Sequence, residues 1–491
     1  MPAKIWQYVY QLPLILPTRR SNSKGRGWQK ASGDMAFIDH GPSSNFVKAS
    51  RETIWQIVEE LFPRYRALCG PDFRDSLHIL QKYLDFEIRE FPTGTEVGDW
   101  TIPPEFVVNE AWVEGPDGAR VIDFADHPYH VHIYSGAFDG ELSLDELKER
   151  VSTHPDLPDA IPLRQSYYRY DWGLCASQNQ VKTWQPGTYK VHIDTELNDG
   201  ALRVGEYYLP GESKKEIMVC TYLCHPFGAN DNLSGVAVAT ELFRRLSEMK
   251  DRRYSYRLCI WPETIGALTW IDANRAKLNN IVGGYEISIC GDDAPIRYVK
   301  SYFGDALVDR AFGHALRNSG LAHEILEYDG VCNGSDQAHF NAIGLRVPFG
   351  HPIRGGHITP EIPGKKQIGY AEYHSSADDL NLIKPENLSD IMEVTWDAIQ
   401  AIERARTYKA TFTGTPFLSK HGVFPYQHGL GTGTTATRAT FGGLAYYQLM
   451  IDADGEKDLL AIADGSALPI EAYDDAVENF LKAGLIEEAV A

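Results

Sequence analysis

The stretch of the chain that decides the fold reads Thr221-Tyr-Leu-Cys-His225-Pro-Phe-Gly-Ala-Asn-Asp231-Asn-Leu-Ser-Gly235. It places an imidazole and a carboxylate around one short turn. The residues from Glu216 to Leu223 have the apolar character of a buried parallel strand, and those from Val236 onward have helical spacing. The pattern predicts a strand that ends near His225 and a helix that follows Asp231, at the sheet edge where open α/β folds bind ligands.

Four later segments also place a candidate ligand or acid after an apolar run. They are Trp261-Pro-Glu263-Thr-Ile-Gly266, Gly284-Tyr-Glu286-Ile287, Gly334-Ser-Asp336-Gln-Ala-His-Phe340 and Tyr373-His374-Ser-Ser-Ala-Asp378. Taken alone, Asp231 and its Asn neighbours are ordinary turn and helix-cap residues. The ordered series favours a functional site over that structural interpretation.

In this order the series resembles the co-catalytic zinc aminopeptidases, a superfamily that also contains glutaminyl cyclases. Gly228–Gly235 matches the element that carries the metal-bridging Asp, Ser335–Gln337 and Tyr373–Ser375 match the last two elements, and the resemblance covers roughly residues 190–405. The runs around Cys224-His-Pro, Pro262-Glu-Thr-Ile-Gly and Trp172-Gly-Leu-Cys resemble, more narrowly, a bacterial aminopeptidase-like family. That resemblance spans nearly the whole chain, and the family's members often accompany surface-polysaccharide biosynthesis.

The resemblance implies a zinc-dependent hydrolase. His225, Asp231 and His374 are the expected zinc ligands, with Asp231 as a candidate bridge between two metals, and Glu286 is a weaker fourth ligand. Zinc takes imidazole nitrogen and carboxylate oxygen, and a catalytic site keeps one position open for water. Glu263 matches the first Glu of the family's Glu-Glu pair, which acts as the general base.

Two positions depart from the family pattern. Thr264 stands where the family supplies a second Glu to the metal that His374 also holds, and Phe227 stands where it has an Asp that orients the histidine ring. We therefore expect the chain to bind one zinc ion rather than two. Two zinc sites of unequal affinity, or a degenerate metal-binding protein without activity, stay open. Asp378 is a candidate for the missing carboxylate that orients the histidine ring. Alternatively, it caps a helix that begins at Asp379.

Three residues are candidates for contact with substrate. Asp336 lies where the family contacts substrate or supports the site, and His351 and His357 flank a Gly-Gly turn. The expected substrate is a peptide that loses its N-terminal residue, or a related small amide. Amide hydrolysis or acyl transfer on an amino-sugar or glycan precursor is the alternative.

The expected fold class is α/β, with a mostly parallel central sheet flanked by helices, an inserted β-rich domain and a C-terminal winged-helix-like domain. The expected boundaries are 1–43 for a disordered or spurious extension with Met35 as an alternative start, 44–92 and 191–407 for the catalytic domain, 93–190 for the inserted domain, and 408–491 for a linker and the winged-helix-like domain. The C-terminal segment offers few basic residues, so we expect it to make structural or protein contacts.

Composition narrows the class of partner and the compartment. The chain has 491 residues, 43% of them hydrophobic, and a net charge of -20, which is typical of a soluble multidomain protein and argues against nucleic acid as a main partner. No apolar run has the length of a membrane span. Seven cysteines without paired spacing favour reduced thiols and a cytoplasmic setting. A homo-oligomer stays open.

Overall fold

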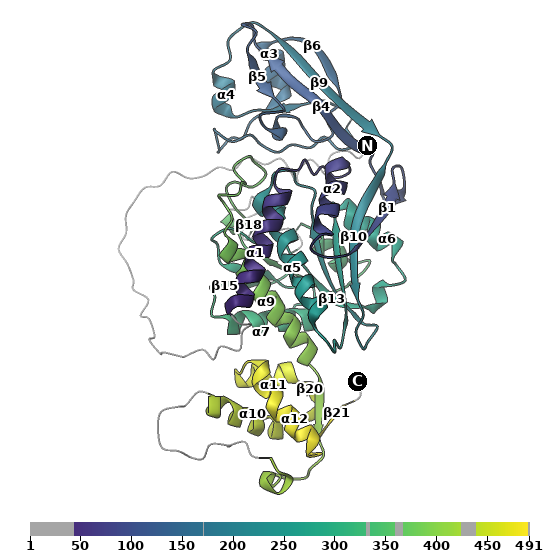
Figure 1. The fold of residues 1–491 in the computed structure, drawn as a ribbon, viewed down its shortest axis with the longest axis vertical. Helices are drawn as coiled ribbons and strands as arrows, with labels where there is room; N and C mark the ends of the chain where they lie inside the picture. The colour runs from purple at the N-terminus through teal and green to yellow at the C-terminus, as the bar shows by residue number, and fades with distance from the viewer. Residues whose placement is uncertain (1–43, 170, 330–333, 359–366, 424–437, 490–491) are drawn as a thin grey trace, which may run out of the picture.

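One eight-stranded sheet forms the middle of the computed structural model, which describes residues 44–169, 171–329, 334–358, 367–423 and 438–489 (Figure 1). The strand order is β1-β10-β12-β11-β13-β16-β14-β15. The strands are β1 (Glu87–Pro92), β10 (Ala201–Leu209), β11 (Glu216–Tyr222), β12 (Ser255–Trp261), β13 (Ile281–Glu286), β14 (Ile296–Val299), β15 (His323–Leu326) and β16 (Phe349–Ile353). The central strands β12, β11, β13 and β16 are parallel, whereas β1, β10 and β14 pair antiparallel with a neighbour.

The central strands are parallel and apolar because helices cover the sheet. Every residue of β11 and β12 is buried, as expected for strands enclosed on both faces. The helices of this unit are α1 (Ser44–Leu61), α2 (Pro71–Leu80), α5 (Ser234–Glu248), α6 (Ile265–Ala273), α7 (Leu307–Ser319), α8 (Gln337–Asn341) and α9 (Pro385–Arg404), with the short η3 (Ala229–Leu233) and η4 (Leu278–Asn280). Helix α9 packs against α1, α5 and α7. The prediction of an α/β class with a large helix-flanked sheet is confirmed.

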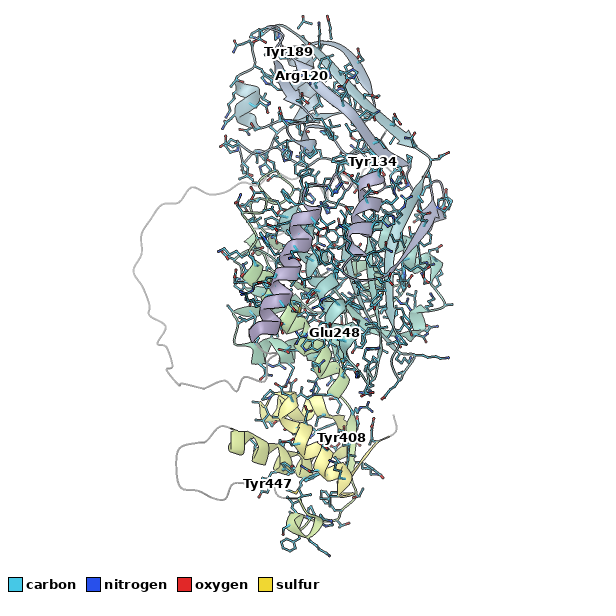
Figure 2. The ribbon with its side chains drawn as sticks, viewed as in Figure 1. Arg120, Tyr134, Tyr189, Glu248, Tyr408 and Tyr447 are labelled. Carbon is cyan, nitrogen blue, oxygen red and sulfur yellow. The ribbon has the colours of Figure 1, made fainter. Side chains whose placement is uncertain are left out.

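A second, antiparallel sheet lies beyond one end of the central unit, between β1 and β10 in the sequence (Figure 1). Its order is β5-β4-β9-β6, and Arg120 and Tyr189 mark its position (Figure 2). Its elements are β4 (Glu105–Glu114), β5 (Arg120–Asp123), η2 (Pro128–His130), β6 (Phe138–Ser143), α3 (Leu144–Arg150), α4 (Gln178–Lys182) and β9 (Thr188–Asn198), with the short strands β2 (Glu96–Val97), β3 (Trp100–Thr101), β7 (Val151–Ser152) and β8 (Leu174–Cys175). It has a hydrophobic core of its own, which includes Leu147, Leu174 and Val191.

This inserted unit is the β-rich segment that the sequence predicts, although strand β9 crosses the expected boundary at residue 190 and pairs with β4 up to Asn198. The division of the chain into domains stays a prediction. The expected extension, residues 1–43, lies outside the described residues.

The C-terminal part combines helices with a three-stranded sheet of order β20-β19-β21. Its elements are β19 (Thr407–Ala410), η5 (Leu418–His421), α10 (Arg438–Asp452), β20 (Asp454–Asp458), α11 (Leu459–Ser466), η6 (Ile470–Tyr473), α12 (Asp474–Lys482) and β21 (Ile486–Glu488). Arg310 of α7 holds Asp458 through two hydrogen bonds of 3.0 and 2.6 Å, which ties this part to the central unit. A winged-helix identity stays a prediction, and the Gly/Thr-rich linker largely falls outside the described residues.

None of the helices among the described residues combines the length and the apolar character that crossing a membrane requires. The six cysteines that the structure describes are all buried, and none of them pairs with another.

Candidate metal centre

Three expected ligands, His225, Asp231 and His374, come together at the carboxyl end of the central sheet. One potential ligand atom from each lies within 4.8 Å of the others. Asp231 Oδ1 is 3.8 Å from His225 Nδ1, and Asp231 Oδ2 is 3.1 Å from His374 Nε2. His225 follows β11, Asp231 lies in η3, and His374 lies in the loop before α9. Residues 149 positions apart in the sequence thus form one cluster.

The cluster fits a cation. Three of its buried atoms, His225 Nδ1, Asp231 Oδ2 and His374 Nε2, make no hydrogen bond to any residue that the structure describes. Buried polar atoms are rarely left without a partner, because each such atom costs free energy. Two imidazole nitrogens and a carboxylate oxygen are ligands that zinc takes, and three protein ligands leave one position open.

The protonation states also suit ligands. Burial lowers the pKa of His225 to about 4, so the ring is neutral at pH 7. Burial alone would raise the pKa of Asp231, but His225, His374 and the Tyr222 hydroxyl outweigh it and bring the pKa to about 2. A neutral imidazole and an ionised carboxylate are the forms that bind metal.

Asp378 holds the backbone that carries Asp231. Its two oxygens accept hydrogen bonds from the amides of Asn230, at 2.7 Å, and Asp231, at 3.0 Å. The Tyr370 hydroxyl donates to the same carboxylate at 2.7 Å. The alternative, that Asp378 caps a helix starting at Asp379, is wrong, because the next helix, α9, begins at Pro385.

Glu263 lies beside the cluster, with Oε2 at 3.7 Å from His225 Nε2. Its other oxygen accepts a hydrogen bond of 2.9 Å from the Ser335 hydroxyl. Burial, together with the nearby Asp336 and Asp231 carboxylates, raises the pKa of Glu263 well above its usual value. The carboxylate therefore has a high proton affinity and faces a ligand without belonging to the three-residue cluster, a position that suits a general base.

Glu286, the weaker fourth ligand, is fully buried at the end of β13 and lies outside the three-residue cluster. Its Oε2 accepts a hydrogen bond of 2.6 Å from the backbone N–H of Gln337. Its Oε1 has no hydrogen-bond partner among the described residues. Burial, then the nearby Asp336, raises its pKa to about 8. The unpaired oxygen leaves Glu286 available to a cation, and its role as a ligand stays a prediction.

Asp336 uses both oxygens inside the protein. Oδ2 accepts the Trp261 indole N–H at 2.7 Å, and Oδ1 accepts the Thr264 amide at 2.7 Å. It therefore supports the loop after β12, which carries Glu263. Contact between Asp336 and a substrate stays a prediction, and these two bonds do not favour it.

His351 and His357 lie in strands, and not in the loop around a Gly-Gly turn that the sequence predicts. His351 lies within β16, only 5% exposed, with Nε2 at 2.6 Å from Ser288 Oγ. Burial lowers its pKa to about 3. His357 lies in β17 (Gly356–Ile358), which pairs with β18 (Gln367–Gly369), and its side chain is outside the described residues. Their contact with substrate stays a prediction.

Four residues at this edge other than glycine have a strained backbone conformation. Phe227, Thr264, Ile289 and His374 all adopt positive φ, at 53°, 65°, 50° and 53°. Such conformations are uncommon for residues other than glycine and persist only where the surroundings fix them. The Phe227 ring packs against Phe62, with centroids 5.6 Å apart, so it contributes packing at the position where the family has a carboxylate.

The sequence did not predict the roles of two residues near the cluster, Tyr222 and Arg66. The Tyr222 hydroxyl donates to Asp231 Oδ1 at 2.6 Å, and the buried Arg66 guanidinium donates to the carbonyls of Leu223, at 3.2 Å, and His225. A tyrosine in a buried strand is ordinary, so it gives no signal. Arg66 directly precedes the apolar Ala67-Leu-Cys run, which is only a weak signal.

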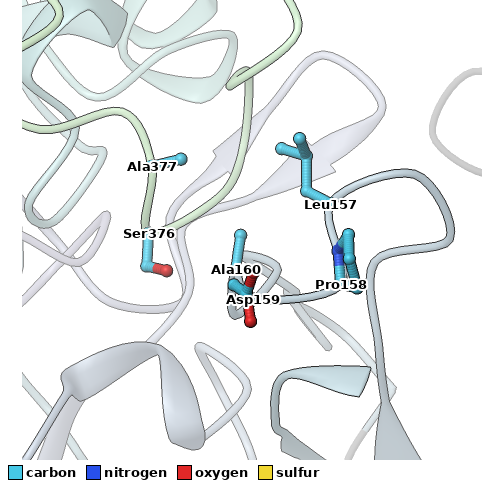
Figure 3. Close-up of a pocket in the computed structure, with 6 residues that line it drawn as sticks. All are labelled: Leu157, Pro158, Asp159, Ala160, Ser376 and Ala377. Carbon is cyan, nitrogen blue, oxygen red and sulfur yellow. The ribbon is translucent and has the colours of Figure 1, made fainter. Parts of the chain in front are cut away.

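A shallow hollow of about 290 Å³ adjoins the His374 loop (Figure 3). It is lined by Leu157, Pro158, Asp159, Ala160, Ser376 and Ala377. One side comes from the inserted unit, and the other comes from the residues that follow His374. The lining is mostly apolar, with Asp159 as its one charged residue among those named.

Comparisons with known proteins identify relatives of this fold. Residues 55–405 match a family described as a domain of unknown function (DUF4910). A Clostridium acetobutylicum protein, described as a polysaccharide biosynthesis protein with an aminopeptidase-like domain, is 34% identical over 90% of this chain and 99% of its own length.

Solved structures of other proteins are also similar to this chain. A crystal structure from Clostridium acetobutylicum, described as a peptidase, has a TM-score of 0.80 at 33% identity and covers 90% of this chain and 98% of its own. BSAP, a zinc aminopeptidase from Bacillus subtilis, has a TM-score of 0.52 at 13% identity and covers 72% of this chain and 94% of its own. The second likeness shows that the two chains share a fold.

Proposed function

The chain belongs to the DUF4910 family, and we propose that it is a zinc-dependent hydrolase that removes N-terminal residues from peptides or cleaves a related amide bond. The observation that carries the proposal is the cluster of His225, Asp231 and His374, whose potential ligand atoms lie within 4.8 Å of one another. The shared fold with a zinc aminopeptidase supports it.

Each neighbouring residue then has a role. Zinc, when bound by the three ligands, polarises a carbonyl and acidifies water. Glu263 takes the proton from the attacking water and delivers it to the leaving amine, while Ser335 orients its carboxylate. Asp378 and Tyr222 hold Asp231 in place.

We favour one zinc ion per chain. The Tyr222 hydroxyl donates to Oδ1 of Asp231 at 2.6 Å, and Oδ2 lies 3.1 Å from His374 Nε2. Thr264 brings no carboxylate to a second ion. The missing carboxylate at position 264 is therefore the feature that disfavours a second ion.

The second candidate is hydrolysis or acyl transfer at an amide of an amino sugar or glycan precursor. The name of the Clostridium acetobutylicum relative, which refers to polysaccharide biosynthesis, favours it. The hollow beside His374 is open and mostly apolar, so its lining does not discriminate between a side chain and a sugar ring.

Cleavage assays with the zinc-loaded protein separate these candidates. We expect turnover of aminoacyl anilides that carry a free amine, and none of the same anilides after N-acetylation or of N-acetyl amino sugars. Glu263→Gln should retain zinc and lose roughly a hundredfold or more in turnover, the scale of a positioned general base. Glu403→Gln is the control, because Glu403 is a buried Glu that accepts the Tyr256 hydroxyl elsewhere in the fold.

Three outcomes would count against the proposal. Exclusive turnover of the N-acetyl amino sugars would favour the second candidate. Loss of zinc together with turnover in Glu263→Gln would make Glu263 a ligand, and unchanged turnover would remove it from the mechanism.

A further inference from the structure

The inserted unit reaches the loop that carries His225. Tyr129 lies in η2 of this unit, and its hydroxyl donates a hydrogen bond of 2.6 Å to the carbonyl of Pro226, the residue after His225. Tyr129 is only 2% exposed, so water does not compete for that bond. Next to it, the His127 ring packs against Phe227, with centroids 5.9 Å apart.

The same unit also pairs with the loop that carries His374. The Leu163 amide donates to the His374 carbonyl at 2.7 Å, and the Ser376 amide donates to the Ile161 carbonyl at 2.8 Å. The Ser376 hydroxyl accepts the Ile161 amide at 2.9 Å. Pro162 and Ser375 thus lie opposite each other in an antiparallel bridge.

These contacts fix the backbone of the two loops that carry His225 and His374, which are not strands of the central sheet. His225 lies beyond the last residue of β11, and His374 has a strained φ of 53° in a loop without regular structure. A strained backbone persists only when its surroundings over-determine it. For His374, the flanking hydrogen bonds at residues 374 and 376 come from the inserted unit.

We propose that the inserted unit is a positioning element of the metal centre. Tyr129 holds the His225 loop, and residues 161–163 hold the His374 loop, so that the two imidazoles are kept at the separation that one ion requires. The inference rests on the proposed function, because it presumes that these histidines bind zinc. Groups that fix the ligands of a metal contribute strongly to its affinity, although they never touch it.

The test compares two tyrosines of the inserted unit. Tyr129→Phe removes only the bond to Pro226. Tyr134→Phe is the matched control, because Tyr134, labelled in Figure 2, is also 2% exposed and its hydroxyl donates at 2.8 Å to the carbonyl of Pro104, which belongs to neither loop. We expect Tyr129→Phe to weaken zinc binding by about tenfold in competition with a chelating indicator, and Tyr134→Phe to leave it unchanged.

Two further measurements isolate positioning from folding. The cobalt-substituted Tyr129→Phe protein should show shifted visible absorption bands, because these bands report the ligand geometry. In the metal-free protein, Tyr129→Phe should speed amide hydrogen exchange in residues 229–233, and Tyr134→Phe should not. Thermal midpoints of the two variants show whether each loses a similar amount of stability.

Unchanged zinc affinity and unchanged exchange in Tyr129→Phe would overturn the inference, and so would equal weakening in both variants. Failure of the proposed function looks different. If His225→Ala and His374→Ala bind zinc as the natural protein does, the metal site is wrong, whereas the exchange measurement still decides whether Tyr129 holds the His225 loop.

Discussion

At the scale of single residues, Thr264 stands where the resemblance to the zinc aminopeptidases leads us to expect a metal-binding carboxylate. Its hydroxyl cannot replace a carboxylate as a metal ligand. Its backbone has a φ of 65°, and its amide is held by Asp336 at 2.7 Å. The loop is therefore fixed in place, although the residue at its tip carries no charge.

Writing a carboxylate at this position should restore a second site. We expect Thr264→Glu to raise zinc stoichiometry or affinity in a titration followed by elemental analysis, because the added carboxylate is a further oxygen ligand beside His374 and Asp231. Thr264→Gln, of the same size without the charge, is the control and should change little. A natural protein that already holds two zinc ions through mild chelation would contradict this account of the departure.

The resemblance of the ordered motifs to the zinc aminopeptidases predicted His225, Asp231 and His374 as one set, and the structure brings the three together. The motifs gave no indication of Tyr222 or Arg66. Tyr222 donates its hydroxyl to Asp231, and Arg66 donates to backbone carbonyls. Contacts of these kinds leave no pattern in one sequence.

At the scale of elements, periodicity predicted β11 and α5, because a continuous apolar run and a 3.6-residue repeat are strong signals. It misplaced His351. A Gly-rich segment reads as a loop, yet Phe349–Ile353 forms β16, parallel to β13 and antiparallel to β14. Pairing with two distant strands decides this element, and the local composition does not.

The buried His351 predicts a pH dependence. Its pKa is lowered to about 3 by burial, against about 6.5 in an unfolded chain. The unfolded state therefore binds more protons between pH 6.5 and 3, so the free energy of unfolding falls as pH falls through that window, by up to about 1.4 kcal/mol per pH unit for this residue.

We expect His351→Gln to flatten this dependence in part, since glutamine offers Ser288 a hydrogen bond without titrating. Urea denaturation midpoints of the metal-free protein between pH 6.5 and 4.5 measure it, with the exposed His323→Gln as control. The flattening is partial because burial also lowers the pKa of His127 and of His132 to about 4. A slope equal to that of the natural protein would contradict the prediction.

At the scale of the whole molecule, the central unit is joined to the inserted unit and to the C-terminal part by contacts that no local pattern encodes. The inserted unit meets the His374 loop through Ile161 and Ser376, which are 215 positions apart. The C-terminal part meets α7 through Arg310 and Asp458, 148 positions apart. Strand and helix patterns, together with the family resemblance, predicted the α/β class and the further units, but the position of the inserted unit against the loops of His225 and His374 comes only from the tertiary structure.

The zinc content of the purified protein and of three variants, His225→Ala, Asp231→Ala and His374→Ala, tests the central claim most directly. His314→Ala is the control, because His314 is a buried histidine that pairs with Asp464 at 2.7 Å on another face. We expect about one zinc per chain in the natural protein and in the control, and a sharp loss in each of the three variants. Zinc unchanged in all three would show that these residues do not form the metal centre.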